Sequence, residues 1–162
     1  MKIRKFAIVA APLLALGLIG PAAGQTFEKE LTHSIKPCQG AGPALWIQVW
    51  GIKNDVGTVR VVLYRAKQED WLKKGRWMQR VEIPAKKGSM QVCMPVPEAG
   101  SYAVAMRHDA NGNDNDDIFA DGGGMSNDPS INLFNLGKPH VSKATFSVGK
   151  EVKSMRIKMR YL

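Results

Sequence analysis

The densest group of reactive side chains in this sequence is HDANGNDNDD, residues 108–117, which is rich in carboxylates and carboxamides and directly follows an alternating apolar run. Calcium is bound by roughly six to eight oxygen atoms, commonly supplied by alternate residues of a tightly wound loop. Side-chain oxygens recur at alternate positions here, so the spacing suits such a loop. The candidate metal ligands are Asp109, Asn111, Asn113, Asn115, Asp117 and Asp121.

The end of this pattern departs from a helix–loop–helix calcium loop. Such a loop has Gly at its sixth position and a bidentate acid at its twelfth. Here these positions hold Asp114 and Ala120, and Asp121 comes one residue late. We therefore predict a weak structural Ca²⁺ loop over residues 109–121, with a dissociation constant of about 10⁻⁴ to 10⁻³ M. The alternative is a set of turns in which Asn and Asp side chains hydrogen-bond the backbone without metal.

His108 suggests a second kind of site, a catalytic metal centre, because an imidazole beside a carboxylate can hold a catalytic metal. With Asp109, His33 or His140 it would form the centre of a metal-dependent hydrolase. The competing interpretation, which we favour, is a histidine at a strand end that is hydrogen-bonded to a loop carbonyl. Ser126 lacks the G-x-S-x-G context of a nucleophile. We predict no catalytic residue and a protein that is not an enzyme.

The first 24 residues have the pattern of a secretory signal peptide: a basic start, an apolar stretch over residues 6–19 and small residues up to Gly24. We expect cleavage near Gly24 and a periplasmic or secreted protein. No cysteine follows the site to carry a lipid anchor, and no later segment is apolar enough to span a bilayer. The mature chain then has a polar lead-in over residues 25–43 and one domain over residues 44–162.

The net charge of the chain is +9 and falls to +6 without the three basic residues of the leader. A surplus of this size draws a protein toward anionic surfaces or simply keeps it soluble. Because no run of Lys or Arg exceeds a pair, we expect no specific nucleic-acid partner. A stripe of Arg156, Lys158 and Arg160 near the end either meets an anionic polymer or protects the edge of a sheet.

Cys38 and Cys93 are the two cysteines of the chain. An even number in an exported protein predicts a disulfide. Its loop is long enough to stabilise the fold by about 4 kcal/mol in the chain-entropy model. A zinc site or a catalytic thiol is the alternative, but no C-x-x-C motif supports it.

Short apolar runs with turn residues between them predict an all-β fold. In the last run Met155, Ile157 and Met159 alternate with basic residues, as in a half-buried strand. A short helix is expected near residues 67–74. The expected strands cover residues 45–52, 58–64, 89–96, 100–108, 144–149 and 154–162, with one more within residues 109–140. About seven strands and no long helical period indicate a single antiparallel β-sandwich.

GSYAVAMRHDANGNDNDDIF followed by GGGMSND resembles a family of exported bacterial proteins, domain of unknown function 2141 (DUF2141). The matching residues are Gly100, Tyr102, Ala103, His108, Asp109, Asn111, Gly112, Asn113, Asp117, Gly124, Ser126, Asn127, Ala144 and Phe146. The resemblance covers about residues 44–162 and implies an immunoglobulin-like or transthyretin-like sandwich of unestablished activity. Where the family carries a longer stretch with Pro and Glu, this chain has ADGGG, so any metal would need Asp121 in place of that Glu.

These observations predict an exported, non-enzymatic β-sandwich that serves as a binding or accessory module of the cell envelope, with an unknown envelope ligand or protein as partner. A metal-dependent hydrolase and an envelope structural protein that binds anionic polymer are the alternatives. The glycine-rich stretch GGGMSN, residues 122–127, lacks the spacing of a phosphate-binding loop. We expect it to form a turn whose residues need positive φ.

Overall fold

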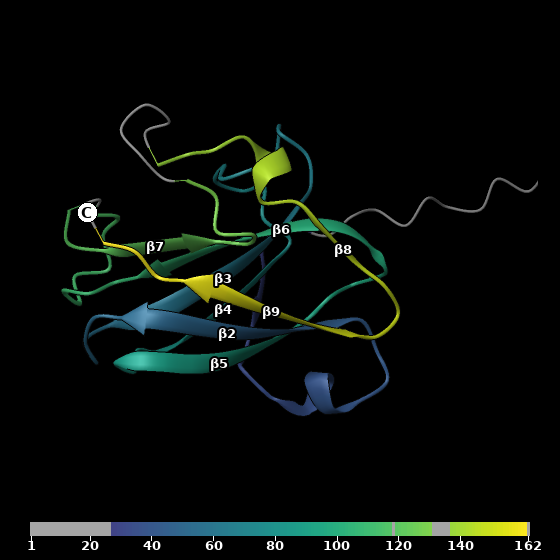
Figure 1. Ribbon diagram of the computed structural model, residues 1–162, viewed down its shortest axis with the longest axis horizontal. Coiled ribbons are helices and arrows are strands. Elements are labelled where there is room, and N and C mark those ends of the chain that lie inside the picture. Colours follow the sequence, from purple (N-terminus) through teal and green to yellow (C-terminus); the bar gives the residue numbers. More distant parts are fainter. Residues whose placement is uncertain (1–26, 118, 131–136, 162) are drawn as a thin grey trace, which may run out of the picture.

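The computed structural model describes residues 27–117, 119–130 and 137–161. The signal peptide expected over residues 1–24 lies outside these ranges. Among the described residues, the protein is all-β with two short 3₁₀ helices, as predicted (Figure 1). The strands are β1 (Lys29–Leu31), β2 (Ala44–Ile52), β3 (Thr58–Arg65), β4 (Gln79–Pro84), β5 (Gly88–Pro95), β6 (Gly100–His108), β7 (Gly122–Met125), β8 (Phe146–Val148) and β9 (Val152–Lys158); the 3₁₀ helices are η1 (Lys36–Gln39) and η3 (Val141–Lys143).

The strands form two sheets that share one core. The larger sheet has the order β1-β4-β3-β6-β7, with β8 also paired to β6, and the smaller has the order β5-β2-β9. Figure 1 shows β2 lying between β5 and β9. The end of the chain then joins the two sheets, because Arg160 and Gly123 exchange backbone hydrogen bonds.

Both sheets are mixed, so the prediction of a purely antiparallel sandwich is wrong. β1 runs parallel to β4, and β2 runs parallel to β9. Parallel pairs require long connections, and each of these pairs joins segments far apart in sequence. The described strands also exceed the expected seven by β1 and β4. β1 has three residues and β4 is rich in polar side chains, so neither shows a strong hydrophobic alternation.

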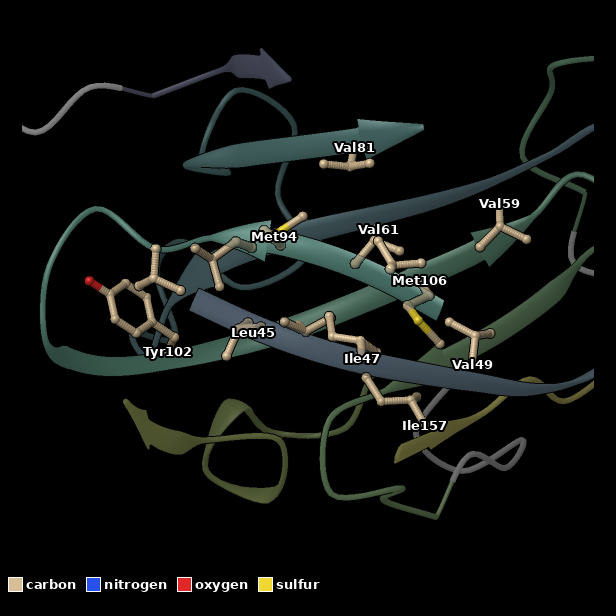
Figure 2. Close-up of a cluster of buried hydrophobic side chains, with 14 of the residues drawn as sticks. Leu45, Ile47, Val49, Val59, Val61, Val81, Met94, Tyr102, Met106 and Ile157 are labelled. Carbon is tan, nitrogen blue, oxygen red and sulfur yellow. The ribbon is translucent and has the colours of Figure 1, made fainter. Parts of the chain in front are cut away.

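The core lies between the sheets and follows the two-residue period of the strands. Leu45, Ile47 and Val49 of β2 are fully buried and point toward the larger sheet, as Figure 2 shows. Their partners in the shared cluster include Val59, Val61, Leu63, Val81, Val92, Met94, Val104, Met106 and Ile157. In β9, Ile157 is buried while Arg156 and Lys158 are exposed, so the predicted alternation of the last strand is confirmed.

The connection between β3 and β4 covers the outer face of the larger sheet. The expected helix over residues 67–74 is absent, and this segment forms turns instead. Leu72 and Gly75 adopt positive φ, which an α-helix cannot include. Trp71 packs edge-on against Tyr64, and its Nε1–H donates to the carbonyl of Pro139 at 2.9 Å.

A buried carboxylate stabilises this connection. The Asp70 side chain is fully buried and forms ion pairs with Arg65 at 2.6 Å and Arg76 at 2.7 Å. Burial alone would raise the pKa of Asp70, but hydrogen bonds and charge from the two guanidiniums lower it below its usual value. The Phe27 ring lies 4.7 Å from each of these guanidiniums, so the same pair also holds the N-terminal segment.

Candidate functional site

The predicted disulfide between Cys38 and Cys93 is present, with Cα atoms 5.9 Å apart. Cys93 lies on the outer face of β5, and the bond holds η1 and the preceding segment against the smaller sheet. The lead-in over residues 25–43 contributes η1 and also the edge strand β1. The disulfide thus ties the segment that supplies an edge of the larger sheet to the smaller sheet.

The acidic loop, residues 109–121, follows β6 and is organised by the carboxylate of Asp109. This side chain is 4% exposed and accepts backbone N–H groups from Gly112 at 3.0 Å, Asn113 at 3.2 Å and Asp114 at 3.1 Å. A buried carboxylate requires donors of this kind to replace its water. Asp109 therefore shapes the first half of the loop.

In the second half of the acidic loop, two more carboxylates accept backbone N–H groups in the same way. Asp121, which is 7% exposed, accepts N–H groups from Ala110 at 3.3 Å and Asp117 at 3.1 Å. Asp117 in turn accepts N–H groups from Phe119 at 3.1 Å and Ala120 at 3.3 Å. The bonds of Asp121 join the two ends of the loop.

The asparagines of the loop form local turns. The Asn111 side-chain oxygen accepts the N–H of Asn113 at 3.2 Å, and the Asn113 side chain accepts the N–H of Asn115 at 2.9 Å. This is the hydrogen-bonded turn that Asn favours outside regular structure. No side-chain hydrogen bond of Asn115 is seen among the described residues.

The carboxylates of the loop do not gather at one point. Within residues 27–117, 119–130 and 137–161, no three His, Cys, Asp or Glu side chains gather to hold a metal ion. The carboxylates of Asp109, Asp117 and Asp121 point at different backbone N–H groups. The geometry matches the hydrogen-bonded alternative, and the Ca²⁺ site stays a prediction of the sequence.

The outer side of the acidic loop contacts two arginines of the larger sheet. Arg60 of β3 and Arg107 of β6 lie opposite each other in register, an arrangement of like charges that needs compensation. Asp114 lies 3.5 Å from Arg60 and 3.8 Å from Arg107, and Arg107 also pairs with Asp116. The loop is therefore bound to the outer face of the larger sheet by charge.

Glu82 of β4 lies opposite Arg60, so Glu82, Arg60 and Arg107 form a charged row across the larger sheet. The Glu82 carboxylate accepts from Arg60 at 2.9 Å and from the Thr58 hydroxyl at 2.7 Å. Burial by itself would raise the pKa of Glu82, but these hydrogen bonds and the Arg60 charge lower it below its ordinary value. The hydrogen bond with Glu82 also raises the pKa of Arg60.

His108 is fully buried at the end of β6, with both ring nitrogens engaged. Nε2 donates to the carbonyl of Val56 at 2.9 Å, so Nδ1 accepts the Tyr161 hydroxyl. That hydroxyl accepts the N–H of Lys53 at 3.0 Å, and burial raises the pKa of Tyr161. The expected bond from His108 to a loop carbonyl is confirmed, and the ring has no free nitrogen for a metal.

The other two histidines make separate contacts. His33 accepts the backbone N–H of Cys93 at 3.3 Å, and His140 bonds Ser142 beside η3. Ser126 is buried, accepts the N–H of Val104 at 3.0 Å and donates to the carbonyl of Ala144. His33 and Ser126 thereby join backbone segments far apart in sequence, whereas the contact of His140 with Ser142 is local.

The expectation for the glycine-rich stretch, residues 122–127, holds only in part: its glycines do not adopt positive φ, whereas Asn127 at its end does. Gly122–Gly124 belong to β7, and the positive φ values fall on Asn127 and Asp128 just after it. A Cβ at Gly122 would lie 2.6 Å from the Tyr161 ring, and one at Gly124 would lie 2.7 Å from the Lys158 carbonyl. These glycines allow β7 to approach the last segment of the chain closely.

A second region, which we name the basic face, lies on the outer side of the smaller sheet. Trp50 of β2 is opposite Lys158 of β9, and Gln48 is opposite Arg156. Lys158 Nζ lies 4.8 Å, and the Arg156 guanidinium 5.7 Å, from the centre of the Trp50 ring. The described residues include no ion-pair partner for either cation.

The sequence revealed only part of the basic face. The predicted stripe was Arg156, Lys158 and Arg160, but the Arg160 guanidinium donates to the carbonyls of Pro129 and Asp128. The aromatic partner of the other two cations, Trp50, did not stand out in the sequence. β2 and β9 are separated by most of the domain, so only their parallel pairing brings the three residues together. The alternation of polar or aromatic residues with core residues along β2 was the available signal.

These features define an all-β protein with two packed mixed sheets, a carboxylate-organised loop and a basic outer face. The chain belongs to the family described as "Uncharacterized protein conserved in bacteria (DUF2141)", whose sequence model matches residues 47–156. The family predicted from the residues is thereby confirmed. No curated protein and no solved structure matches the chain. No helix in the described ranges is long and apolar enough to cross a membrane.

Proposed function

We propose that this protein is an exported, non-enzymatic binding or accessory module of the cell envelope. The leader pattern of residues 1–24 and the Cys38–Cys93 disulfide support export, because disulfides persist in oxidising compartments. The mature protein acts in the periplasm or outside the cell. An immunoglobulin-like or transthyretin-like arrangement stays part of this proposal, and it must accommodate the two parallel strand pairs.

The proposal that the protein is not an enzyme rests on one observation: the side chains that could act in catalysis are hydrogen-bonded within the fold. His108 has both nitrogens hydrogen-bonded, and Asp109, Asp117 and Asp121 accept backbone N–H groups of their own loop. A general base or a metal ligand requires a free lone pair directed at substrate or metal. His108 has no such lone pair, and each of the three carboxylates uses two or three of its acceptor sites on the loop, which supports a protein that acts through its surface.

The test of export uses the full chain expressed in a bacterium that has a periplasm. We expect a periplasmic or secreted product that lacks residues 1–24 by N-terminal sequencing and whose cysteines resist alkylation until they are reduced. A matched variant with Leu13→Arg and Leu14→Arg breaks the apolar stretch and keeps the product inside with its leader intact. Cytoplasmic retention of the unaltered chain would contradict export.

The test of catalysis compares the parent chain with His108→Gln, which preserves the size and one hydrogen bond of the ring. We expect no hydrolysis of phosphate, ester, peptide or glycoside reporters by either protein in the presence of Zn²⁺, Mn²⁺ or Ca²⁺. A hydrolytic activity that disappears in a folded His108→Gln protein would establish the hydrolase alternative. Circular dichroism of the variant separates lost chemistry from lost fold.

A further inference from the structure

Charge is separated between the two sheets of this protein. The acidic loop lies on the outer face of the larger sheet, where Asp114 contacts Arg60 and Arg107. The smaller sheet carries cations at one end, because the register places Trp50 opposite Lys158 and Ile52 opposite Gly88. The exposed cations that this register gathers are Lys53, Lys86, Lys87, Arg156 and Lys158.

Two acids lie near these cations and do not neutralise them by ion pairs. Asp55 accepts the backbone N–H of Lys87 at 2.7 Å, and Asp128 accepts the backbone N–H of Lys158 at 2.9 Å. In the part of the chain that the structure describes, the side chains of Arg156 and Lys158 contact the Trp50 ring and no carboxylate. The surplus of positive charge is therefore available to a partner.

The Trp50 ring holds two of these cations in place. Lys158 and Arg156 approach the indole from the neighbouring strand, at 4.8 and 5.7 Å from its centre. Cation–π contact orders both side chains while it leaves their N–H groups free to donate. An ordered pair of cations loses less conformational entropy on binding an anion than two free side chains lose.

The shape and composition of the basic face favour an extended anionic surface over a small molecule. Small-molecule sites are concave and mostly apolar. Here polar side chains of three neighbouring strands share the outer face of the sheet: Gln48 on β2, Gln91 on β5 and Arg156 on β9. Tryptophan beside Lys and Arg is also the composition that membrane–water interfaces favour.

We propose that the basic face, formed by Arg156 and Lys158 beside Trp50 with the exposed Lys53, Lys86 and Lys87 at the same end of the smaller sheet, binds the phosphate headgroups of an anionic phospholipid membrane. The assignment rests on the proposed export, which places the protein beside the membranes of the envelope. Lys and Arg supply the charge, and the planar Arg156 guanidinium suits two phosphate oxygens at once.

The experiment is co-sedimentation of the purified, oxidised protein with vesicles. One set contains phosphatidylcholine alone, and the other contains about 30% phosphatidylglycerol, which supplies the anionic surface. We expect binding to the anionic vesicles only, with release at about 0.5 M salt because the interaction is electrostatic. Equal binding to both sets, or to neither, would overturn the proposal.

Paired charge variants test which surface binds. Arg156→Gln with Lys158→Gln removes two charges from the basic face, and we expect roughly 20- to 30-fold weaker binding. The matched control is Lys73→Gln with Lys74→Gln, which removes two exposed charges from the connection between β3 and β4. An equal loss in both double variants would show that net charge alone acts, and the basic face would not be the site.

Two further measurements separate this inference from the proposed function. Trp50→Ala should weaken vesicle binding at a temperature where circular dichroism shows the variant to be folded, although loss of this partly buried ring lowers its unfolding midpoint. Tighter binding to single-stranded DNA than to the anionic vesicles would overturn the membrane assignment. Failure of vesicle binding with export intact overturns only this inference, whereas vesicle binding by a protein that is not exported overturns only the proposed location.

Discussion

The acidic loop and the basic face both concentrate charge, but they use it differently. In the acidic loop, Asp109 and Asp121 are nearly buried and accept N–H groups from their own backbone. On the basic face, Arg156 and Lys158 are exposed and contact an indole ring. The comparison shows that the buried carboxylates of a dense reactive group can serve the fold itself, while a plainer group of cations stays available to a partner.

The difference arises because the side chains of the two regions differ in whether they can accept hydrogen bonds from the backbone. A loop that leaves a strand must satisfy its backbone N–H groups, and Asp and Asn side chains do this within a few residues. Cations on long flexible side chains cannot satisfy neighbouring N–H groups, because they are donors themselves. Acidic side chains after a strand therefore tend to hydrogen-bond the neighbouring backbone, whereas basic side chains on a sheet face stay available for other contacts.

The largest effect expected is the loss of the Asp109 carboxylate. Asp109→Ala leaves three N–H groups without their acceptor in a site that is 4% exposed, so we expect a loss of about 3 kcal/mol in the free energy of unfolding. Urea denaturation of the oxidised protein measures it. Asp116→Ala, at a position whose side chain is 88% exposed, is the control and should change stability little. Equal effects of the two substitutions would contradict the organising role of Asp109.

Acid should weaken the ion pair between Glu82 of β4 and Arg60 of β3 within the larger sheet. The folded-state pKa of Glu82 lies below its ordinary value of 4.5, so its stabilisation is present above that value and is lost as pH falls through the lowered pKa. Glu82→Gln should cost about 1.5 kcal/mol at pH 7 and show a flatter decline below pH 4.5. Urea unfolding at a series of pH values measures both; parallel pH profiles of parent and variant would refute the assignment.

Calcium tests whether the acidic loop is as self-contained as its hydrogen bonds indicate. A site with a dissociation constant of about 1 mM would add about 1 kcal/mol at roughly 5 mM Ca²⁺. We expect a rise of this size from the spacing of the loop oxygens, whereas an unchanged melting temperature in Ca²⁺ and in chelator would show that the carboxylates keep their backbone N–H partners instead of binding the ion. A rise with Ca²⁺ but not Mg²⁺ that Asp117→Asn abolishes would establish the calcium loop that the sequence predicts.

The smallest effect is expected on the basic face. Arg156→Gln with Lys158→Gln removes exposed side chains whose contacts are with Trp50, so we expect at most about 1 kcal/mol of destabilisation. Thermal unfolding of the double variant against Lys73→Gln with Lys74→Gln measures the difference. A loss as large as that of Asp109→Ala would mean that the basic face is structural, and the contrast between the two regions would fail.

Several features followed from local sequence. The alternation in β6 and β9 predicted their buried faces, the two cysteines predicted their bond, and the position of His108 at a strand end predicted its bond to a carbonyl. Other features did not follow. β1 and β4 show only weak hydrophobic alternation, so the sequence did not predict them as strands. The glycines of β7 were attributed to positive φ, whereas the structure shows that Tyr161 and Lys158 approach too closely to leave room for a side chain.

The sequence by itself determined the class of fold, the disulfide, the family and the dense acidic loop, because each depends on residues close together in the chain or on composition. Tertiary structure decided whether the side chains of those residues are free to bind a partner or are bound within the fold. The parallel pairing of β2 with β9 placed Trp50 beside two cations, and the Tyr161 hydroxyl hydrogen-bonded the remaining ring nitrogen of His108. Such contacts join segments far apart in sequence, and their free energy comes from packing that no local pattern encodes.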